Sequence, residues 1–182
     1  MRTLARNTIG LAVVAGLAFA TAGCGAASDK GSEWPATLTG NPAPDFTVAA
    51  VANGSGSVSL KDLRGKVVLV DFWGTYCEPC QKSFPKLQDL NTKYATSGLK
   101  IVGISEDEDD DKDKIPGFAA TYGATFSLAW DGDKSIARRY SPETMPSSFL
   151  IGRDGIVRFA HVGFHDGEER EIEDEIRGLL GH

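Results

Sequence analysis

An apolar strand pattern that runs into two closely spaced cysteines limits what this chain can fold into more than any other feature. Residues 67–85 read VVLVDFWGTYCEPCQKSFP, and the run Val67–Val70 is typical of a strand buried on both faces. Cys77 and Cys80 follow after a short turn, at the start of a helical pattern. A C-x-x-C sequence at the junction of a buried strand and a helix indicates a dithiol that cycles with its disulfide.

The spacing of the two cysteines predicts both a disulfide and different roles for the two sulfurs. Cysteines three positions apart on a first helical turn can be bridged, because a disulfide needs Cα atoms roughly 4.4–6.8 Å apart. A helix N-terminus offers unpaired N–H groups and the positive end of the dipole, which stabilise a thiolate there. The thiolate is the nucleophile, so we expect Cys77 to attack and Cys80 to resolve the mixed disulfide.

Asp71 interrupts the apolar strand with a carboxyl group. Burying this group costs free energy and should raise its pKa. Beneath a dithiol, such a carboxylic acid can accept the proton of Cys80 and return it during exchange. The alternative is an aspartate at a strand end that is half solvated or caps a backbone group. Because the cysteines follow so closely, we interpret Asp71 as the proton carrier.

The segment VDFWGTYCEPCQKSFP resembles the active-site segment of the thioredoxin superfamily. Asp71 stands where thioredoxins have a buried aspartate, and Trp73 matches the tryptophan before the motif. The tetrad C-E-P-C, with Glu78 and Pro79 between the cysteines, is most similar to the TlpA/ResA group of extracytoplasmic thiol–disulfide oxidoreductases. The stretch GNPAPDFTV also resembles the N-terminal hairpin shared by TlpA-like proteins and peroxiredoxins, the AhpC/TSA-TlpA group. The resemblance implies work in cytochrome c maturation or oxidase assembly, and the sequence does not choose between them.

Two positions depart from the TlpA/ResA group. Its members more often carry asparagine where this chain has Asp71, so proton handling here is expected to be closer to that of thioredoxin. Members of the ResA type carry a glutamate three residues after the second cysteine, and here that residue is Ser83. A role that depends on that glutamate is therefore not carried over to this chain.

A second segment, TMPSSFLI, has a proline at the start of an apolar strand, where a missing N–H group is tolerated. It resembles the segment of thioredoxin-fold proteins in which a cis-proline packs against the dithiol. The resemblance implies a cis peptide bond before Pro146, with the neighbouring backbone free to pair with a substrate strand. Met145 would then contact the substrate, and the alternative is that it fills the core.

The fold implied by the resemblance is a thioredoxin-like α/β fold, with a central mixed β-sheet flanked by helices. Its additions are an N-terminal β-hairpin, with a turn at Asn53–Gly56, and a helix inserted after the buried strand Leu99–Ile104. The acidic stretch 105–114 lacks the glycine and the ligand spacing of a calcium loop. We interpret that stretch as a solvated loop and helix start.

The N-terminus has the pattern of a bacterial signal peptide. Arg2 and Arg6 precede an apolar stretch of 12 residues, Ile9–Ala20, which is too short for an ordinary membrane span. Small residues then lead to Cys24, which resembles the cysteine of a lipobox, where it becomes the lipidated N-terminus of the mature protein. The alternatives are ordinary secretory cleavage at the end of the apolar stretch and an uncleaved anchor.

We therefore expect a signal peptide over 1–23, a lipidated cysteine and flexible tether over 24–41, and a thioredoxin-like domain over 42–182. The protein would be exported and lipid-anchored in the cell envelope, facing the periplasm or the outside of the cytoplasmic membrane. With lipid on Cys24, the other two of the three cysteines form one complete pair, and no structural disulfide remains.

The expected partners are disulfide-containing protein substrates, an electron donor in the membrane or outside the cytoplasm, and the membrane itself through the lipid anchor. No cofactor or metal is expected, and a net charge of −6 argues against nucleic acid. Glu78 and Asp71 place negative charge near the dithiol and should oppose thiolate formation at Cys77. We therefore expect the pKa of the Cys77 thiol to be closer to that of thioredoxin than to that of strong oxidants, and the protein to be a reductase.

Two other functions are open at the level of sequence. A thiol peroxidase of the peroxiredoxin kind has P-x-x-x-T/S-x-x-C around its attacking cysteine, whereas Val70 and Gly74 occupy the Pro and Thr/Ser positions here. A copper-handling protein would combine the thiolates with an imidazole, for which His161 and His165 are available. Copper chaperones of the Sco kind, however, use C-x-x-x-C, and a histidine within a strand, such as His161, suits a structural role. The oxidoreductase is the function that we expect.

Overall fold

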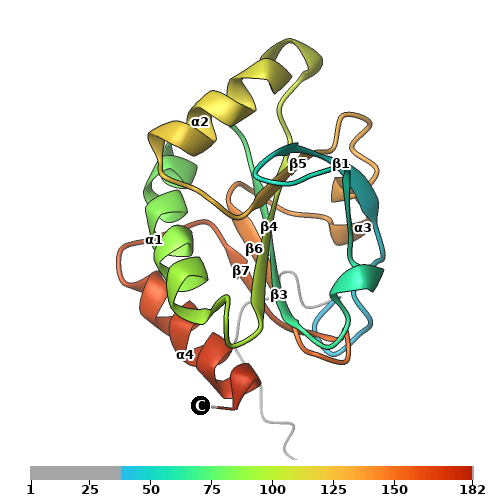
Figure 1. The fold of residues 1–182 in the computed structure, drawn as a ribbon, viewed down its shortest axis with the longest axis vertical. Coiled ribbons are helices and arrows are strands. Elements are labelled where there is room, and N and C mark those ends of the chain that lie inside the picture. Colours follow the sequence, from blue (N-terminus) through green and yellow to red (C-terminus); the bar gives the residue numbers. More distant parts are fainter. Residues whose placement is uncertain (1–37, 182) are drawn as a thin grey trace, which may run out of the picture. The chain divides into compact units, whose positions relative to one another are not determined.

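A seven-stranded mixed sheet forms the centre of the described part of the chain, residues 38–181 of the computed structural model (Figure 1). Its strands are β1 (Thr47–Ala52), β2 (Ser57–Ser59), β3 (Val67–Trp73), β4 (Leu99–Ser105), β5 (Ser127–Trp130), β6 (Ser147–Ile151) and β7 (Val157–Val162). The helices are α1 (Glu78–Tyr94), α2 (Ile115–Thr121), α3 (Ala137–Tyr140) and α4 (Glu168–Leu180), with 3-10 helices η1 (Lys61–Leu63) and η2 (Asp109–Lys114). In space the strands follow the order β2-β1-β5-β4-β3-β6-β7.

The strand that leads to the cysteines, β3, lies inside the sheet. It pairs in parallel with β4 on one side and antiparallel with β6 on the other. All seven of its residues are buried, because helices cover both faces of the sheet. A strand in this position must be apolar on both faces, which explains the run Val67–Val70. Asp71 is the one acidic residue of this strand, so its burial needs a separate reason.

The helices form a layer on each side of the sheet (Figure 1). On one side, α1, α2 and α4 enclose a core that includes Leu69, Phe84 and Ile176. On the other side, α3 covers a second core that includes Val70 and Tyr140. Successive residues of β3 point to opposite faces, so the strand contributes alternately to the two cores. This alternation places Asp71 on the same face as Leu69, beneath α1 and α4.

The thioredoxin-like architecture predicted from the sequence is confirmed, including both additions to it. β1 and β2 form the N-terminal hairpin, in which Val48 lies opposite Val58. η2 and α2 are inserted between β4 and β5. The structure fixes the start of α1 more precisely than the sequence pattern could. The helix begins at Glu78, because Cys77 has the extended backbone of an N-cap residue. The first cysteine therefore precedes the helix, and the second lies within its first turn.

The described part of the chain begins at residue 38, four residues ahead of the expected domain start at residue 42. Residues 38–41, which we assigned to the tether, form a turn whose Gly40 N–H donates to the Val157 carbonyl oxygen at 2.9 Å. The backbone N–H of Val157 donates in turn to Asn41 at 3.0 Å, so this turn is part of the folded unit. The segments expected to be a signal peptide and the rest of the tether, with Cys24, lie outside the described residues. Among residues 38–181, no helix combines the length and apolarity that crossing a bilayer requires.

Candidate active site

The two cysteines lie where the chain passes from β3 to α1. The Cys77 sulfur caps the helix, accepting a hydrogen bond from the N–H of Cys80 with an N–S distance of 3.2 Å. Pro79 occupies the first turn, where its missing N–H group would have no helical partner in any case. This arrangement places the Cys77 sulfur at the positive end of the α1 dipole, where a thiolate is stabilised.

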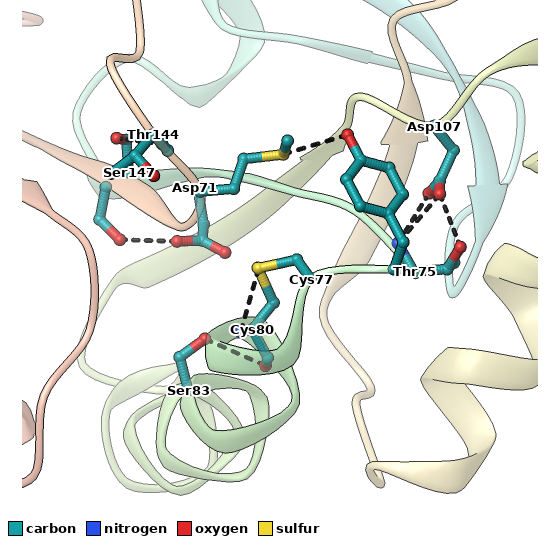
Figure 2. The surroundings of a disulfide bond; sticks show 11 residues. Asp71, Thr75, Cys77, Cys80, Ser83, Asp107, Thr144 and Ser147 are labelled. Carbon is teal, nitrogen blue, oxygen red and sulfur yellow. Dashed lines mark hydrogen bonds between the residues drawn. A yellow bond between two sulfur atoms is a disulfide. The ribbon is translucent and has the colours of Figure 1, made fainter.

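The disulfide between Cys77 and Cys80 is formed, as the spacing predicts, with Cα atoms 5.2 Å apart (Figure 2). The two residues differ in accessibility, since Cys77 is 7% exposed and Cys80 is 0% exposed. Cys77 therefore keeps a small exposed surface at which a partner could approach, whereas Cys80 is fully enclosed by its surroundings. This asymmetry favours Cys77 as the attacking residue and Cys80 as the resolving residue.

Asp71 is a fully buried carboxyl group near the disulfide (Figure 2). The Ser148 hydroxyl donates a hydrogen bond to its Oδ1 at 2.6 Å, and Oδ2 has no hydrogen-bond partner among residues 38–181. Burial raises the pKa of Asp71 to about 7, the Ser148 hydrogen bond partly opposes this rise, and the negative charge of Glu168 adds to it. This direction agrees with the expected rise in pKa, and the full burial of the side chain contradicts the half-solvated alternative. At neutral pH this group can both take up and release a proton.

The peptide bond between Met145 and Pro146 is cis, as the resemblance implied. The loop before β6 is held by Ser147, whose hydroxyl donates to the Thr144 carbonyl oxygen at 2.7 Å. Met145 packs against the core beneath α1, and its sulfur accepts a hydrogen bond from the Tyr76 hydroxyl at 3.9 Å (Figure 2). Met145 thus contributes to the core and also borders the surface next to the disulfide.

Trp73 and Glu78, two further residues singled out in the motif, differ in their surroundings. The Trp73 ring is buried and packs on Phe84 and Phe118, with ring centroids 4.5 and 4.7 Å away. The Glu78 side chain is 81% exposed and lies 3.8 Å from Lys82. Solvent and the Lys82 ammonium screen its charge, so Glu78 opposes a thiolate at Cys77 less than the sequence argument assumed.

Asp107 is a buried carboxylate that the sequence analysis missed, because the whole stretch 105–114 was interpreted as solvated. Its carboxylate accepts hydrogen bonds from the Thr75 N–H at 3.0 and 3.1 Å and from the Thr75 hydroxyl at 2.6 Å (Figure 2). The Ser105 hydroxyl donates to it as well, at 2.6 Å. Thr75 belongs to the turn before Cys77, so Asp107 fixes this turn from the end of the neighbouring strand. The serine two positions earlier was the available signal, since short polar side chains often pair locally.

The surface next to the disulfide is hollowed on both sides of Tyr76, a side chain that is 60% exposed. The larger hollow, about 600 Å³, is lined by Tyr76, Met145 and Glu106 among others. Burial and the negative charge of Asp131 raise the pKa of Glu106 to about 7. The smaller hollow, about 370 Å³, lies toward Phe118. An exposed aromatic ring between two hollows, next to a reactive sulfur, is a surface on which a polypeptide can dock.

The histidines considered for copper are engaged elsewhere or exposed. His161 Nε2 lies 2.8 Å from a Glu175 oxygen, and its Nδ1 lies 3.6 Å from a Glu168 oxygen. His165 is mostly exposed to solvent. Within residues 38–181, no group of three or more His, Cys, Asp and Glu side chains is placed to hold a metal ion. The contacts of His161 agree with a structural role in preference to that of a copper ligand.

A thioredoxin-like sheet, a disulfide at the N-terminus of the helix that follows its inner strand, and a cis-proline opening another inner strand together define a thiol–disulfide oxidoreductase. The chain belongs to the AhpC/TSA family, whose family model matches residues 39–160. It is 37% identical to thiol-disulfide oxidoreductase ResA of Bacillus thuringiensis (strain Al Hakam) over 132 residues, which cover 72% of this chain and 74% of that protein.

Other similar proteins support the same class. The thioredoxin-like protein YneN of Bacillus subtilis (strain 168) is 32% identical over 133 residues, covering 72% of this chain and 76% of that protein. Among solved structures, a protein described as a thiol:disulfide interchange protein DsbE from Chlorobium tepidum is 36% identical, with a TM-score of 0.72. The matched region covers 79% of this chain and 98% of that chain. The fold and the chemistry of the site are therefore those of a thiol–disulfide oxidoreductase.

Proposed function

We propose that the protein is an exported reductase of protein disulfides, with Cys77 and Cys80 as its redox pair. The observation that carries this proposal is the combination of a slightly exposed Cys77, a fully enclosed Cys80 and a buried Asp71 whose pKa is about 7. Disulfide exchange needs one sulfur open to a partner, a second held close to it, and a group that moves a proton at neutral pH. Each requirement has a residue that meets it.

In the reducing direction, the Cys77 thiolate attacks a substrate disulfide and forms a mixed disulfide, while one substrate sulfur leaves as a thiolate and takes up a proton. Cys80 then loses its proton to Asp71 and attacks the Cys77 sulfur. The bond between Cys77 and Cys80 forms as the bond to the substrate breaks, and the second substrate sulfur leaves. Two electrons have then passed to the substrate, so a dithiol donor outside the cytoplasm must return them before the next cycle.

The buried carboxyl group of Asp71 supports the reducing direction. When it is ionised, a second negative charge on a nearby sulfur is unfavourable in this enclosed region. A dithiol whose thiolate is poorly stabilised favours the disulfide form and therefore acts as a reductant. The α1 dipole acts in the opposite sense at Cys77, and the exposed Glu78 adds little to either effect. We infer that Asp71 outweighs the dipole.

The reduction potential of the Cys77–Cys80 pair is expected to lie near the ~−270 mV of thioredoxin, well below the ~−120 mV of a strong oxidant. Equilibration of the protein with dithiothreitol redox buffers, followed by thiol alkylation and mass spectrometry, measures it. A potential close to −120 mV would overturn the reductase direction and leave disulfide exchange itself intact.

We also propose that residues 1–23 direct export, that Cys24 carries the lipid, and that the chain up to the folded domain is the tether. The pattern of these residues and the resemblance to an extracytoplasmic group support this placement. The wild-type protein is expected in the membrane fraction of cells and the Cys24→Ser variant in a soluble fraction, since a lipid chain contributes most of the membrane affinity. Membrane association that survives Cys24→Ser would show that another anchor holds the protein.

A further inference from the structure

A row of polar side chains crosses the sheet from the dithiol site toward its β7 edge. Asp71 of β3 lies directly opposite Ser148 of β6, and Ser148 lies directly opposite His161 of β7. Residues directly opposite each other in antiparallel strands project from the same face of the sheet. These three side chains therefore lie in line on the face that α1 and α4 cover.

Carboxyl groups of α4 meet this row at His161. Glu175 lies 2.8 Å from Nε2 of the imidazole, and Glu168 lies 3.6 Å from Nδ1. The second oxygen of Glu168 accepts a hydrogen bond from the backbone N–H of His165 at 3.0 Å. The Glu168 side chain is only 6% exposed, so its charge is largely enclosed by the protein. α4 also contacts β3 directly, and the negative charge of Glu168 acts on Asp71.

Burial strengthens the interactions among these charges. Burial is the main cause of the raised pKa of Asp71, and the Ser148 hydrogen bond opposes it. The negative charge of Glu168 raises this pKa further. Burial alone would lower the pKa of His161, but the hydrogen bond to Glu175 and the charges of Glu175 and Glu168 outweigh it and raise that pKa. An enclosed carboxylate without a partner is costly, and the His161 ring beside Glu168 offsets that cost.

We propose that Glu168 and His161 are positioning residues of the dithiol site, which act on the cysteines through Asp71. Ionised Glu168 helps to keep the proton on Asp71, whereas protonated His161 offsets that effect and holds Glu168 in place. Ser148 lies between Asp71 and His161 in the row, and its hydrogen bond of 2.6 Å orients the Asp71 carboxyl group. The proton chemistry of the site then extends across three strands to α4. This inference rests on the proposed role of Asp71 in disulfide exchange.

Asp71 and His161, at the two ends of the row, face different sets of polar and charged groups. Asp71 faces the Ser148 hydroxyl from β6 and the Glu168 carboxylate from α4. α1 carries the two cysteines, which are joined and uncharged in this form. His161 faces the acidic side chains of α4, namely Glu168, Glu171 and Glu175. The charge of Glu168 thus acts on both Asp71 and His161. Removing Glu168 and removing His161 should therefore shift the pKa of Asp71 in opposite directions.

The test is an infrared titration of the oxidised full-length protein, because the joined cysteines do not titrate in this form. The carboxyl stretch lost in Asp71→Asn identifies the Asp71 band. Glu168→Gln removes a negative charge and is expected to shift the Asp71 midpoint down by about half a pH unit or more. His161→Gln removes a ring that is positively charged when protonated, and it is expected to shift the Asp71 midpoint up.

Asp174→Asn is the matched control, since it removes one carboxylate from the same helix at a side chain that is 78% exposed. It should leave the midpoint unchanged, because solvent screens a charge in that position. Opposite shifts in Glu168→Gln and His161→Gln support the inference. Shifts of the Asp71 midpoint in the same direction, or shifts no larger than that of Asp174→Asn, overturn it. If Glu168 and His161 had a purely structural role, the two variants would not shift the midpoint in opposite directions.

A second measurement does not depend on how well the α4 variants fold. In the wild-type protein, the ring protons of His161 in a proton NMR titration should show an additional inflection at the pH where Asp71 titrates, since coupled groups report each other. That inflection should vanish in Asp71→Asn, and its persistence there would contradict the coupling. Both titrations use oxidised protein and need no turnover, so their failure would leave the roles proposed for Cys77 and Cys80 untouched.

Discussion

Replacing Cys80 with serine is expected to stop the reaction at the mixed disulfide and to leave substrate proteins covalently joined to Cys77. Cys77 is accessible and can still attack, but the enclosed sulfur that would release the substrate is gone. Turnover with a protein disulfide should fall by ~10³-fold or more, because an external thiol must replace an intramolecular one. The Cys77–Cys80 pair, with its Cα atoms 5.2 Å apart, currently supplies that proximity.

Acid-quenched cells that express Cys80→Ser, analysed on non-reducing gels and by mass spectrometry, would show these adducts. Cys77→Ser is the matched control, since it also removes one sulfur of the pair but leaves only the enclosed one. It should trap no partner and should have no turnover. Adducts on Cys77→Ser instead of Cys80→Ser would reverse the two roles, and adducts on neither would contradict a cycle with protein substrates. The identity of the trapped partner would also test the two roles that the resemblance implies, cytochrome c maturation and oxidase assembly.

The features predicted correctly from the sequence are those that depend on neighbours along the chain. Strand β3, the turn after it and the first turn of α1 lie within one short segment, so periodicity and spacing were enough to place Cys77 and Cys80. The Met145–Pro146 segment was recognised by its resemblance, and its bond is cis. The sheet and its helices follow because alternating and continuous apolar runs leave few ways to cover both faces.

The features that sequence reasoning missed depend on contacts between distant segments. Asp107 resembled its acidic neighbours until the fold placed it against Thr75, across the ends of two parallel strands. Glu78 lies between the cysteines in sequence, yet its side chain points to solvent, so proximity along the chain overstated its influence. Glu168 lies far from Asp71 in sequence, and it affects that residue only because α4 packs over β3. Charge effects of this kind require the three-dimensional arrangement.

Asp71→Asn is expected to stabilise the oxidised protein in alkaline solution relative to the wild type. The pKa of Asp71 is about 7 in the folded protein, against an ordinary value of 3.8 for an aspartate in an unfolded chain. Between these two values the unfolded chain has released the proton and the folded protein retains it, so the free energy of unfolding falls as the pH rises. Above pH 7 the loss is complete and amounts to about 4 kcal/mol, as an order of magnitude. Asparagine has no proton to lose, so the variant should avoid this decline.

Urea unfolding of both proteins at about pH 4.5 and about pH 8.5 measures the effect. The comparison between the two pH values cancels any constant cost of burying the amide, and the contribution of Glu106 is common to both proteins. Asp174→Asn, at an exposed site, should follow the wild-type pH dependence. The stabilised Asp71→Asn variant should also resolve mixed disulfides ~10²-fold more slowly at pH 7, because Cys80 has lost its proton acceptor. Equal pH dependence of stability in Asp71→Asn and wild type would show that this carboxyl group does not titrate as a buried acid, and the proposed proton transfer from Cys80 would lose its basis.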